Sequence, residues 1–296
     1  MGRTLFGTDG IRGVAGEYPL NPRTTYAIGA ALGGWISKHH LDPEVAIGMD
    51  TRESGEAIAS SVAAGLARGG VRARFAGVIT TPGVAYLART GHFAAGVMIS
   101  ASHNPYLDNG IKVIDHSGFK LPDEQEHSLE RDIFALLERD IHPSAATLHT
   151  DESLTRAYID YLASTFPGSL DRVLVVLDCA NGAASRLASD LFERLGARVR
   201  AIACSPDGRN INLNCGSLHL SHLRDAVLAF EADLGVAFDG DADRALFVSH
   251  SGKIIDGDAV MLLTGLALNA EGRLGEADGK PVVVATVMSN LGLERA

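Results

Sequence analysis

Three aspartates at alternate positions, Asp239, Asp241 and Asp243, follow directly after the apolar run 234–238. The run predicts a buried strand, and ligand sites of open α/β sheets lie where strands end. Three carboxylates this close repel one another unless a cation or a basic group neutralises them. An all-oxygen donor set with room for water or phosphate favours Mg²⁺. The sequence therefore predicts a magnesium site here, with a solvated acidic turn as the alternative.

A serine that could carry a phosphoryl group, Ser102, lies in a Ser-His-Asn-Pro turn after a second apolar run, 95–99. A serine in such a turn is expected to be exposed to ligand, and it acts as a nucleophile when a neighbour withdraws its proton. Lys112 and a nearby metal ion could do this. No G-x-S-x-G pattern surrounds Ser102, so a hydrolase nucleophile elbow is not expected. Taken alone, these residues are equally compatible with an ordinary turn.

The third candidate element is a glycine-rich loop, residues 7–13, that contains Arg12. Such loops expose backbone N–H groups, and a guanidinium can bind phosphate through two hydrogen bonds. The loop matches neither a Walker A nor a dinucleotide pattern, so it predicts no nucleotide, and alone it is weak evidence. The polar turns 50–52 and 207–212 are as well explained by loop scaffolding as by direct contact.

Apolar strands and helices alternate along the chain, which predicts stacked α/β layers. Strands are expected at 45–49, 71–76, 95–99, 173–177, 199–203, 234–238 and 282–285. Helices are expected at 24–39, 54–68, 82–89, 126–139, 154–165, 183–195, 218–230 and 257–269. The predicted fold class is therefore multi-domain α/β, with mixed-sheet layers repeated in successive domains.

Length and a connector divide these layers into domains. A chain of 296 residues exceeds the size at which single cores usually stop growing. Residues 142–150 have the character of a connector. We expect a serine-bearing α/β domain at 1–150 and an α/β domain with the acidic turn at 151–255. A third domain, 256–296, has about one expected strand and is predicted to be incomplete.

Charge and composition narrow the class of protein. The net charge of -10 argues against a basic face for nucleic acid, so no nucleic-acid partner is expected. The 3 cysteines form no C-x-x-C pair, which favours a reduced cytoplasmic protein over a disulfide framework or a zinc site. The chain has no signal-peptide run and no stretch of about 18 apolar residues, so no membrane partner is expected.

Together, the glycine-rich loop 7–13, the serine turn 100–105 and the acidic turn 239–244 closely resemble the α-D-phosphohexomutase family. The resemblance implies that Ser102 is a phosphoserine and that its phosphate binds Mg²⁺ together with the three aspartates. It implies that Arg12 and Lys112 assist proton transfer and that Arg244 is an active-site arginine. His103, beside the serine, is given only a supporting role.

Within the family, the segments 181–185, 207–217 and 286–292 resemble the branch that acts on glucosamine phosphate. This implies an isomerase that interconverts glucosamine 6-phosphate and glucosamine 1-phosphate through glucosamine 1,6-bisphosphate, feeding UDP-N-acetylglucosamine and cell-wall synthesis. The implied partner is a phosphosugar substrate, and the resemblance allows a homodimer. Ala242 departs from the family, in which glycine is common at this position; the methyl group is tolerated unless the residue needs a positive φ.

A larger departure concerns length. Family members continue with a sugar-recognition loop and a fourth domain that binds substrate phosphate, and neither occurs here, so little or no activity is expected of this chain alone. Two alternatives stay open beside a phosphomannomutase or phosphoglucomutase. One is a haloacid-dehalogenase-like phosphatase, although its order of motifs is not found. The other is a metal-binding regulatory module without turnover.

Overall fold

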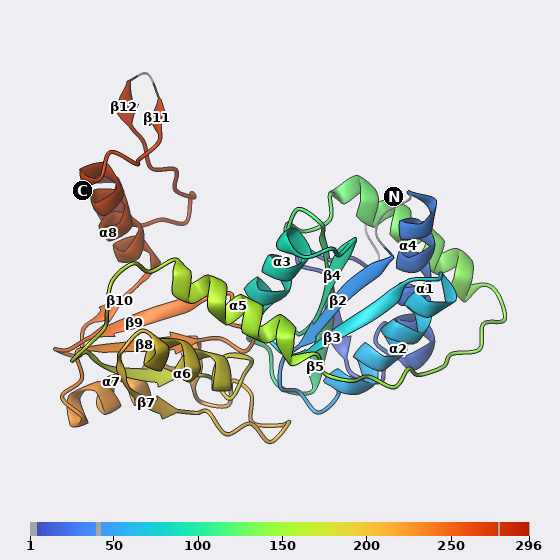
Figure 1. Ribbon diagram of the computed structural model, residues 1–296, viewed down its shortest axis with the longest axis horizontal. Helices are drawn as coiled ribbons and strands as arrows, with labels where there is room; N and C mark the ends of the chain where they lie inside the picture. The colour runs from blue at the N-terminus through green and yellow to red at the C-terminus, as the bar shows by residue number, and fades with distance from the viewer. Residues whose placement is uncertain (1–4, 40–42, 278, 296) are drawn as a thin grey trace.

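Two five-stranded sheets, each flanked by helices, form most of the chain in this computed structural model, which describes residues 5–39, 43–277 and 279–295 (Figure 1). In the first sheet β2 is parallel to both of its neighbours, β3 and β4, whereas β5 is antiparallel to β4 and β1, so the sheet is mixed. Its order is β1 (Ile11–Val14), β5 (Asp108–Asp115), β4 (Ala95–Ile99), β2 (Glu44–Met49) and β3 (Arg72–Val78).

Helices cover both faces of the first sheet, which explains why its central strands are continuous apolar runs rather than alternating ones. Successive residues point to opposite faces, so Ile47 packs in one core and Ala46 in the other. One core lies under α1 (Pro22–Lys38), α2 (Gly55–Arg68) and α4 (Asp123–Leu137). The other lies under α3 (Thr81–Thr90) and α5 (Glu152–Ser164).

The second sheet repeats the arrangement of the first. Its order is β10 (Ile254–Ile255), β9 (Ala245–Ser249), β8 (Leu234–Phe238), β6 (Leu174–Asp178) and β7 (Arg198–Ile202). Here β6 is parallel to β7 and β8, and β9 is antiparallel to β8 and β10. The associated helices are α6 (Ala184–Arg194), α7 (Leu220–Ala229) and a 3₁₀ turn, η1 (Gly216–Leu218). The predicted α/β class with repeated mixed sheets is confirmed.

The helix α5 joins the two sheets. It packs against α3 and β3 of the first lobe and against α6 of the second, and it runs along the molecule between the two lobes in Figure 1. The connector predicted at 142–150 has no helix or strand apart from an isolated bridge between Thr150 and Phe75. The domain boundaries at 150 and 255 stay predictions.

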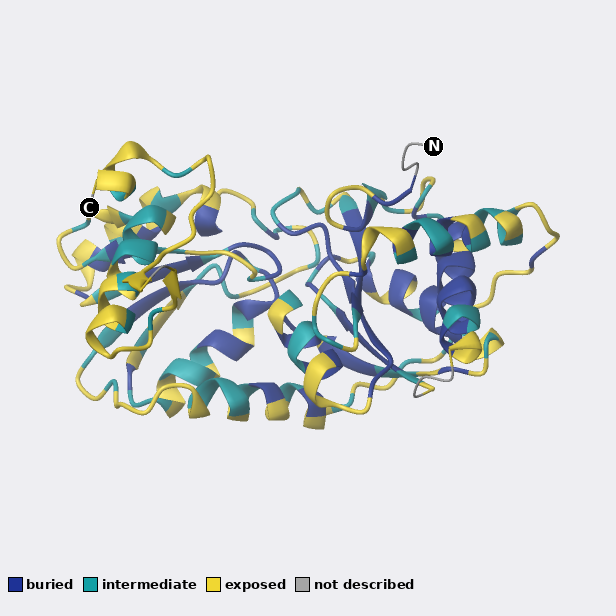
Figure 2. Ribbon diagram, turned by 90° about the horizontal axis from the view of Figure 1, so that it is seen from above, coloured by how far each residue is buried: buried dark blue, intermediate teal, exposed yellow. Residues whose placement is uncertain are grey.

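The C-terminal segment differs from both sheets. It consists of α8 (Gly257–Ala270), the two-residue strands β11 (Glu276–Ala277) and β12 (Lys280–Pro281), and α9 (Leu291–Arg295). It projects from the second lobe, and none of the residues of α8 is buried (Figures 1 and 2). The strand predicted at 282–285 is wrong: these residues are exposed and unpaired in any sheet among the described residues. An apolar run becomes a strand only when a neighbouring strand accepts its hydrogen bonds.

Six strands of the described residues were not predicted from the sequence, namely β1, β5, β9, β10, β11 and β12. The prediction that residues 7–13 form a loop is therefore partly wrong, because Arg12 lies within β1, which pairs antiparallel with β5. The strands β1 and β5 contain glycine and charged residues, and β10, β11 and β12 have two residues each, which hides their periodicity. The strand β9 has neither glycine nor a charged residue, so this reason does not apply to it. By contrast, β4 and β8 have the predicted bounds, and both precede the candidate site.

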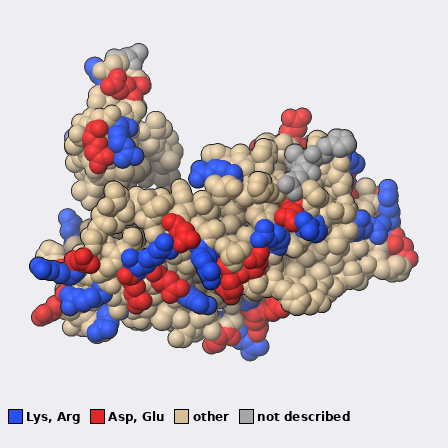
Figure 3. Space-filling view, viewed as in Figure 1, with Lys and Arg blue, Asp and Glu red and all other residues tan. Residues whose placement is uncertain are grey.

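Two surface properties bear on the predicted partners. Among the described residues, no helix combines the length and the apolar character that crossing a bilayer requires. On the face drawn in Figure 3, Lys and Arg side chains are interspersed with Asp and Glu side chains.

Candidate active site

The acidic loop, residues 239–243, brings its carboxylates together at the end of β8. Asp239 and Asp241 are buried and Asp243 is more exposed, and one oxygen from each lies within 4.8 Å of the other two. The loop turns tightly because the Ala242 amide donates to the Asp239 carbonyl over 3.1 Å. Ala242 has a φ of 54°, so the backbone here does need the left-handed conformation that glycine adopts without strain.

Lys112, on β5, is the basic group closest to the acidic loop. Its Nζ lies 2.9 Å from Asp241 Oδ2 and 3.5 Å from Asp243 Oδ2. It also lies 2.9 Å from Asp9 Oδ2, and Asp9 was not singled out from the sequence. Burial alone would lower the pKa of Lys112, but the carboxylates of Asp241 and Asp9 outweigh it and raise the pKa. Lys112 therefore offers a fixed positive charge beside the carboxylates.

Ser102 lies in the serine loop, residues 100–107, that follows β4. Its hydroxyl donates to Asp239 Oδ2 over 2.6 Å and lies 3.3 Å from His103 Nδ1. Ser102 is 0% exposed, so the expectation of an exposed serine is wrong. The physical reason is the second sheet: its acidic loop covers the serine. The structure thus brings together the serine and the carboxylates, which are far apart in the sequence.

Two observations besides its three aspartates indicate that the acidic loop can bind a divalent cation. Asp241 Oδ1 is buried, and within the described part of the chain no donor bonds to it. Burial, followed by the charges of neighbouring aspartates, raises the pKa of Asp239 to about 6, although the Ser102 hydroxyl opposes this. An ion bound by three aspartates and a serine oxygen would satisfy the orphan oxygen and relieve the repulsion. The residues present therefore fit Mg²⁺.

Two arginines lie at the border of the cluster with part of their side chains open to solvent. Arg12 is paired with Asp9 over 2.7 Å, and its Nη1 lies 3.5 Å from the Ala101 carbonyl. The Arg244 side chain is 53% exposed and lies 3.8 Å from Asp243 Oδ1. Partly exposed guanidinium groups beside a buried acidic cluster can bind an incoming anion such as a phosphate.

His103 contacts the serine hydroxyl but is not otherwise built into the cluster. Burial, together with the positive charges of Arg244 and Arg12, lowers its pKa. Its contact of 3.3 Å with the Ser102 hydroxyl is long for a hydrogen bond.

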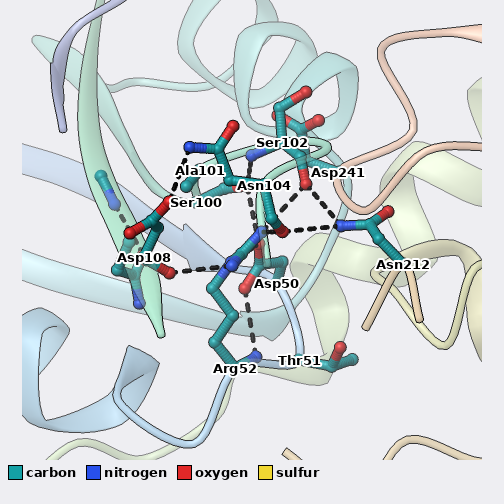
Figure 4. A network of polar contacts seen from close by, with 12 residues as sticks. Asp50, Thr51, Arg52, Ser100, Ala101, Ser102, Asn104, Asp108, Asn212 and Asp241 are labelled. Carbon is teal, nitrogen blue, oxygen red and sulfur yellow. Dashed lines mark hydrogen bonds and ion pairs between the residues drawn. The ribbon is translucent and has the colours of Figure 1, made fainter. Parts of the chain in front are cut away.

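Sequence reasoning left several site residues without a role. Thr81, at the start of α3, donates its hydroxyl to Asp241 Oδ2, and no spacing in the sequence indicated this. Arg52 and Asn212 contact the serine loop through its main-chain carbonyls (Figure 4). Both belong to the polar turns 50–52 and 207–212, which the sequence explained as well by loop scaffolding as by direct contact. A charged residue in a turn after a buried strand was the available signal.

Comparison with family models matches both sheets. Residues 3–140 match "Phosphoglucomutase/phosphomannomutase, alpha/beta/alpha domain I", and residues 156–252 match domain II of the same family.

Curated relatives match over the whole chain. A phosphoglucosamine mutase of Solibacter usitatus is 60% identical over 100% of this chain and 66% of its own length. Another, of Koribacter versatilis, is 48% identical over 99% of this chain and 64% of its own length. The chain thus spans slightly less than two thirds of these relatives.

Solved structures agree with the fold. A phosphoglucomutase/phosphomannomutase family protein from Burkholderia thailandensis superposes with a TM-score of 0.76 at 26% identity, covering 90% of this chain and 59% of that protein.

Proposed function

The chain belongs to the phosphoglucomutase/phosphomannomutase family, and on that premise we propose that the protein is a phosphoglucosamine mutase. It interconverts glucosamine 6-phosphate and glucosamine 1-phosphate, with Ser102 as the phosphoryl carrier and glucosamine 1,6-bisphosphate as the intermediate. The relative with 60% identity, itself named a phosphoglucosamine mutase, supports the choice of sugar. Phosphoglucomutase and phosphomannomutase activities are the alternatives within the family.

One observation carries this proposal: the Ser102 hydroxyl lies 2.6 Å from Asp239, inside a cluster of three aspartates and Lys112. Phosphoryl transfer needs a positioned oxygen nucleophile and groups that neutralise charge on the transferring phosphoryl. The buried serine supplies the oxygen, and Lys112, together with a cation that the carboxylates would hold, would supply the neutralising charge.

The residues divide the work as follows. A Ser102 oxygen, Asp239, Asp241 and Asp243 would hold Mg²⁺, which when bound neutralises negative charge on the phosphoryl group. Lys112 keeps a positive charge at the carboxylates. To Lys112 and the Arg12 guanidinium we assign assistance of proton transfer at the serine. Arg244, with its exposed guanidinium, binds a phosphate of the sugar. His103 has a supporting role beside the hydroxyl.

The test is Ser102→Ala in the full-length protein, assayed for conversion of glucosamine 6-phosphate in the presence of the sugar bisphosphate and Mg²⁺. Loss of the carrier oxygen should lower kcat by about 10³-fold or more. Ser117→Ala is the matched control, because Ser117 is also a turn serine that bonds a carboxylate, Asp115, away from the site. Turnover of the Ser102 variant at the rate of the control would contradict the carrier assignment.

Mass spectrometry of the isolated protein then distinguishes the mutase from the two alternatives, a phosphatase and a regulatory module. A phosphoryl group on Ser102 supports the mutase, whereas one on Asp239 favours a haloacid-dehalogenase-like phosphatase. Metal binding without any phosphoserine or turnover favours a regulatory module. A panel of glucosamine, glucose and mannose phosphates identifies the sugar. The cytoplasmic location and the homodimer stay predictions.

A further inference from the structure

Arg52 is a buried arginine that belongs to none of the reacting groups. It follows β2, and its side chain is 0% exposed. A guanidinium out of water is costly unless it is paired and fully hydrogen-bonded. Asp50 supplies the counter-charge, with its Oδ2 2.9 Å from Arg52 Nε. The remaining four N–H groups of the guanidinium must find acceptors elsewhere.

All four of those donors reach the segment that carries Ser102. Nη2 donates to the carbonyls of Ser102 over 3.0 Å and Asn104 over 2.9 Å. Nη1 donates to the carbonyl of Asp108 over 2.8 Å and to that of Pro105. In Figure 4 the guanidinium lies beneath the loop, with dashed lines to these acceptors. The serine loop is therefore folded around one buried cation.

The second sheet reaches two of the same carbonyls. Asn212 Nδ2 donates to Ser102 O over 2.9 Å and to Asn104 O over 3.1 Å (Figure 4). Gly240, in the acidic loop, packs so closely that a Cβ there would lie 2.4 Å from Ser102 O. The carbonyl of Ser102 is thus held from both lobes, and the hydroxyl of the same residue donates to Asp239.

The backbone of Ser102 explains why such support is needed. Its φ is 54°, a left-handed conformation that costs a residue with a side chain about 1–2 kcal/mol. A loop strained in this way keeps one conformation only where its surroundings fix it.

We propose that Arg52 and Asn212 are positioning residues for phosphoryl transfer, which together fix the serine loop at its distance from the acidic loop. Arg52 shapes the loop from within the first lobe, and Asn212 ties the shaped loop to the second. Neither contacts the Ser102 hydroxyl or the three aspartates, so each acts through the main chain of the loop. The inference rests on the proposed function, because it assigns both residues to the step that Ser102 performs.

Asn212 gives the cleaner test, since its removal leaves no buried charge unpaired. Asn212→Ala deletes both bonds from Asn212 to the serine loop, while Arg52 still satisfies the two carbonyls. A displacement of about 1 Å in a reacting group costs about 10²-fold in rate, so we expect kcat to fall by about 10- to 100-fold with KM nearly unchanged. Asn212→Asp keeps the size of the side chain but replaces the donor with an acceptor, so its kcat should fall at least as far as that of Asn212→Ala.

Asn210→Ala is the matched control, because Asn210 lies in the same turn and its Nδ2 donates to Ser205 O within the second lobe. Arg52→Lys is the second variant. It keeps a positive charge for Asp50 but cannot reach four carbonyls, so kcat should again fall while urea unfolding confirms a folded protein. Its control is Arg23→Lys, since Arg23 also bonds two main-chain carbonyls, those of Leu137 and Arg139, away from the site.

The outcomes separate this inference from the proposed function. If Ser102→Ala keeps its turnover, the proposed function itself fails. If Ser102→Ala is inactive but both Asn212 variants keep the kcat of the Asn210 control, positioning by Asn212 is overturned. A rise in KM with unchanged kcat would also overturn it, because that pattern indicates a substrate-binding contact.

Discussion

The two five-stranded sheets have the same pattern of parallel and antiparallel neighbours, except that the edge strand precedes the others in the chain in the first sheet (β1) and follows them in the second (β10). The loops that follow their central strands, β4 and β8, carry different chemistry. In the first sheet, β4 leads into the serine loop and its nucleophile. In the second, β8 leads into the acidic loop and its carboxylates. The loops meet, with 2.6 Å between the Ser102 hydroxyl and Asp239. The repeated sheet thus supplies two equivalent loop positions, one of which carries the proposed nucleophile and the other the carboxylates.

The loops also differ in how they are supported. Each sheet has a buried aspartate at the end of its fourth strand, Asp50 after β2 and Asp178 in β6. Both accept a main-chain N–H two residues on, over 3.1 and 3.0 Å. The other oxygen of Asp50 then binds Arg52 and Ser100 side chains, whereas that of Asp178 binds the Gly216 amide. Asp50 thus joins a side-chain charge network beneath the strained serine loop, whereas Asp178 accepts two main-chain N–H bonds.

The largest expected effect comes from removing the negative charge of each buried aspartate in turn. Asp50→Asn leaves the Arg52 guanidinium buried without its counter-charge, so the unfolding free energy should fall by about 3–5 kcal/mol. Asp178→Asn disturbs two main-chain hydrogen bonds only, so about 1–3 kcal/mol is expected. Urea unfolding at pH 7 measures both, and equal losses would contradict the difference drawn between the two sheets.

The second prediction tests whether the acidic loop binds the metal ion. Asp241→Asn should weaken Mn²⁺ binding, measured by calorimetry as a stand-in for Mg²⁺, by more than about 10²-fold, since even residues outside the coordination sphere cost 10- to 100-fold. Asp233→Asn is the control, because Asp233 accepts the Leu174 amide at the opposite end of β8. Equal affinities of the two variants for Mn²⁺ would contradict the assignment of the metal site to the acidic loop.

How far the sequence predicts these loops depends on how local each signal is. The strands β4 and β8 are continuous apolar runs, and the aspartates of the acidic loop are neighbours, so both could be predicted. The strands β1 and β5, which mix apolar residues with glycine and charged residues, could not, because they owe their structure to pairing across the sheet rather than to their own pattern. The residues Asn212 and Thr81 bond partners more than a hundred positions away, and no periodicity encodes such a contact.

The same limit applies to burial. Ser102 was expected to be exposed because a turn after a strand usually is, but Asp239 and Gly240 of the second lobe pack against it and it is buried. The apolar run at 282–285 was expected to be a strand, although strand formation depends on a partner that local sequence does not specify. The grouping of serine, aspartates and lysine, by contrast, was accessible through the resemblance of three motifs taken together.

A pH titration sharpens the comparison at Asp178. Burial raises its pKa above the ordinary 3.8. The folded state then binds the proton more readily than the unfolded chain, so the contribution of Asp178 to stability increases as pH falls from neutrality through the raised pKa. The unfolding free energy of the wild type minus that of Asp178→Asn should therefore grow as pH is lowered toward 4. A difference that shrinks would mean that the amide donors hold the pKa low.

The smallest effect concerns backbone strain, which both loops contain: φ is 54° at Ser102 and 54° at Ala242. The serine cannot be replaced without losing the hydroxyl, but Ala242 contributes only a methyl group. Ala242→Gly should raise the unfolding free energy by about 0.5–1 kcal/mol, because glycine adopts this conformation without a steric penalty. Ala245→Gly, in the extended backbone of β9, is the control and should lower it by a similar amount. If both substitutions destabilise equally, the left-handed turn is not where the acidic loop stores strain, and the parallel between the two loops is limited to their place in the sheets.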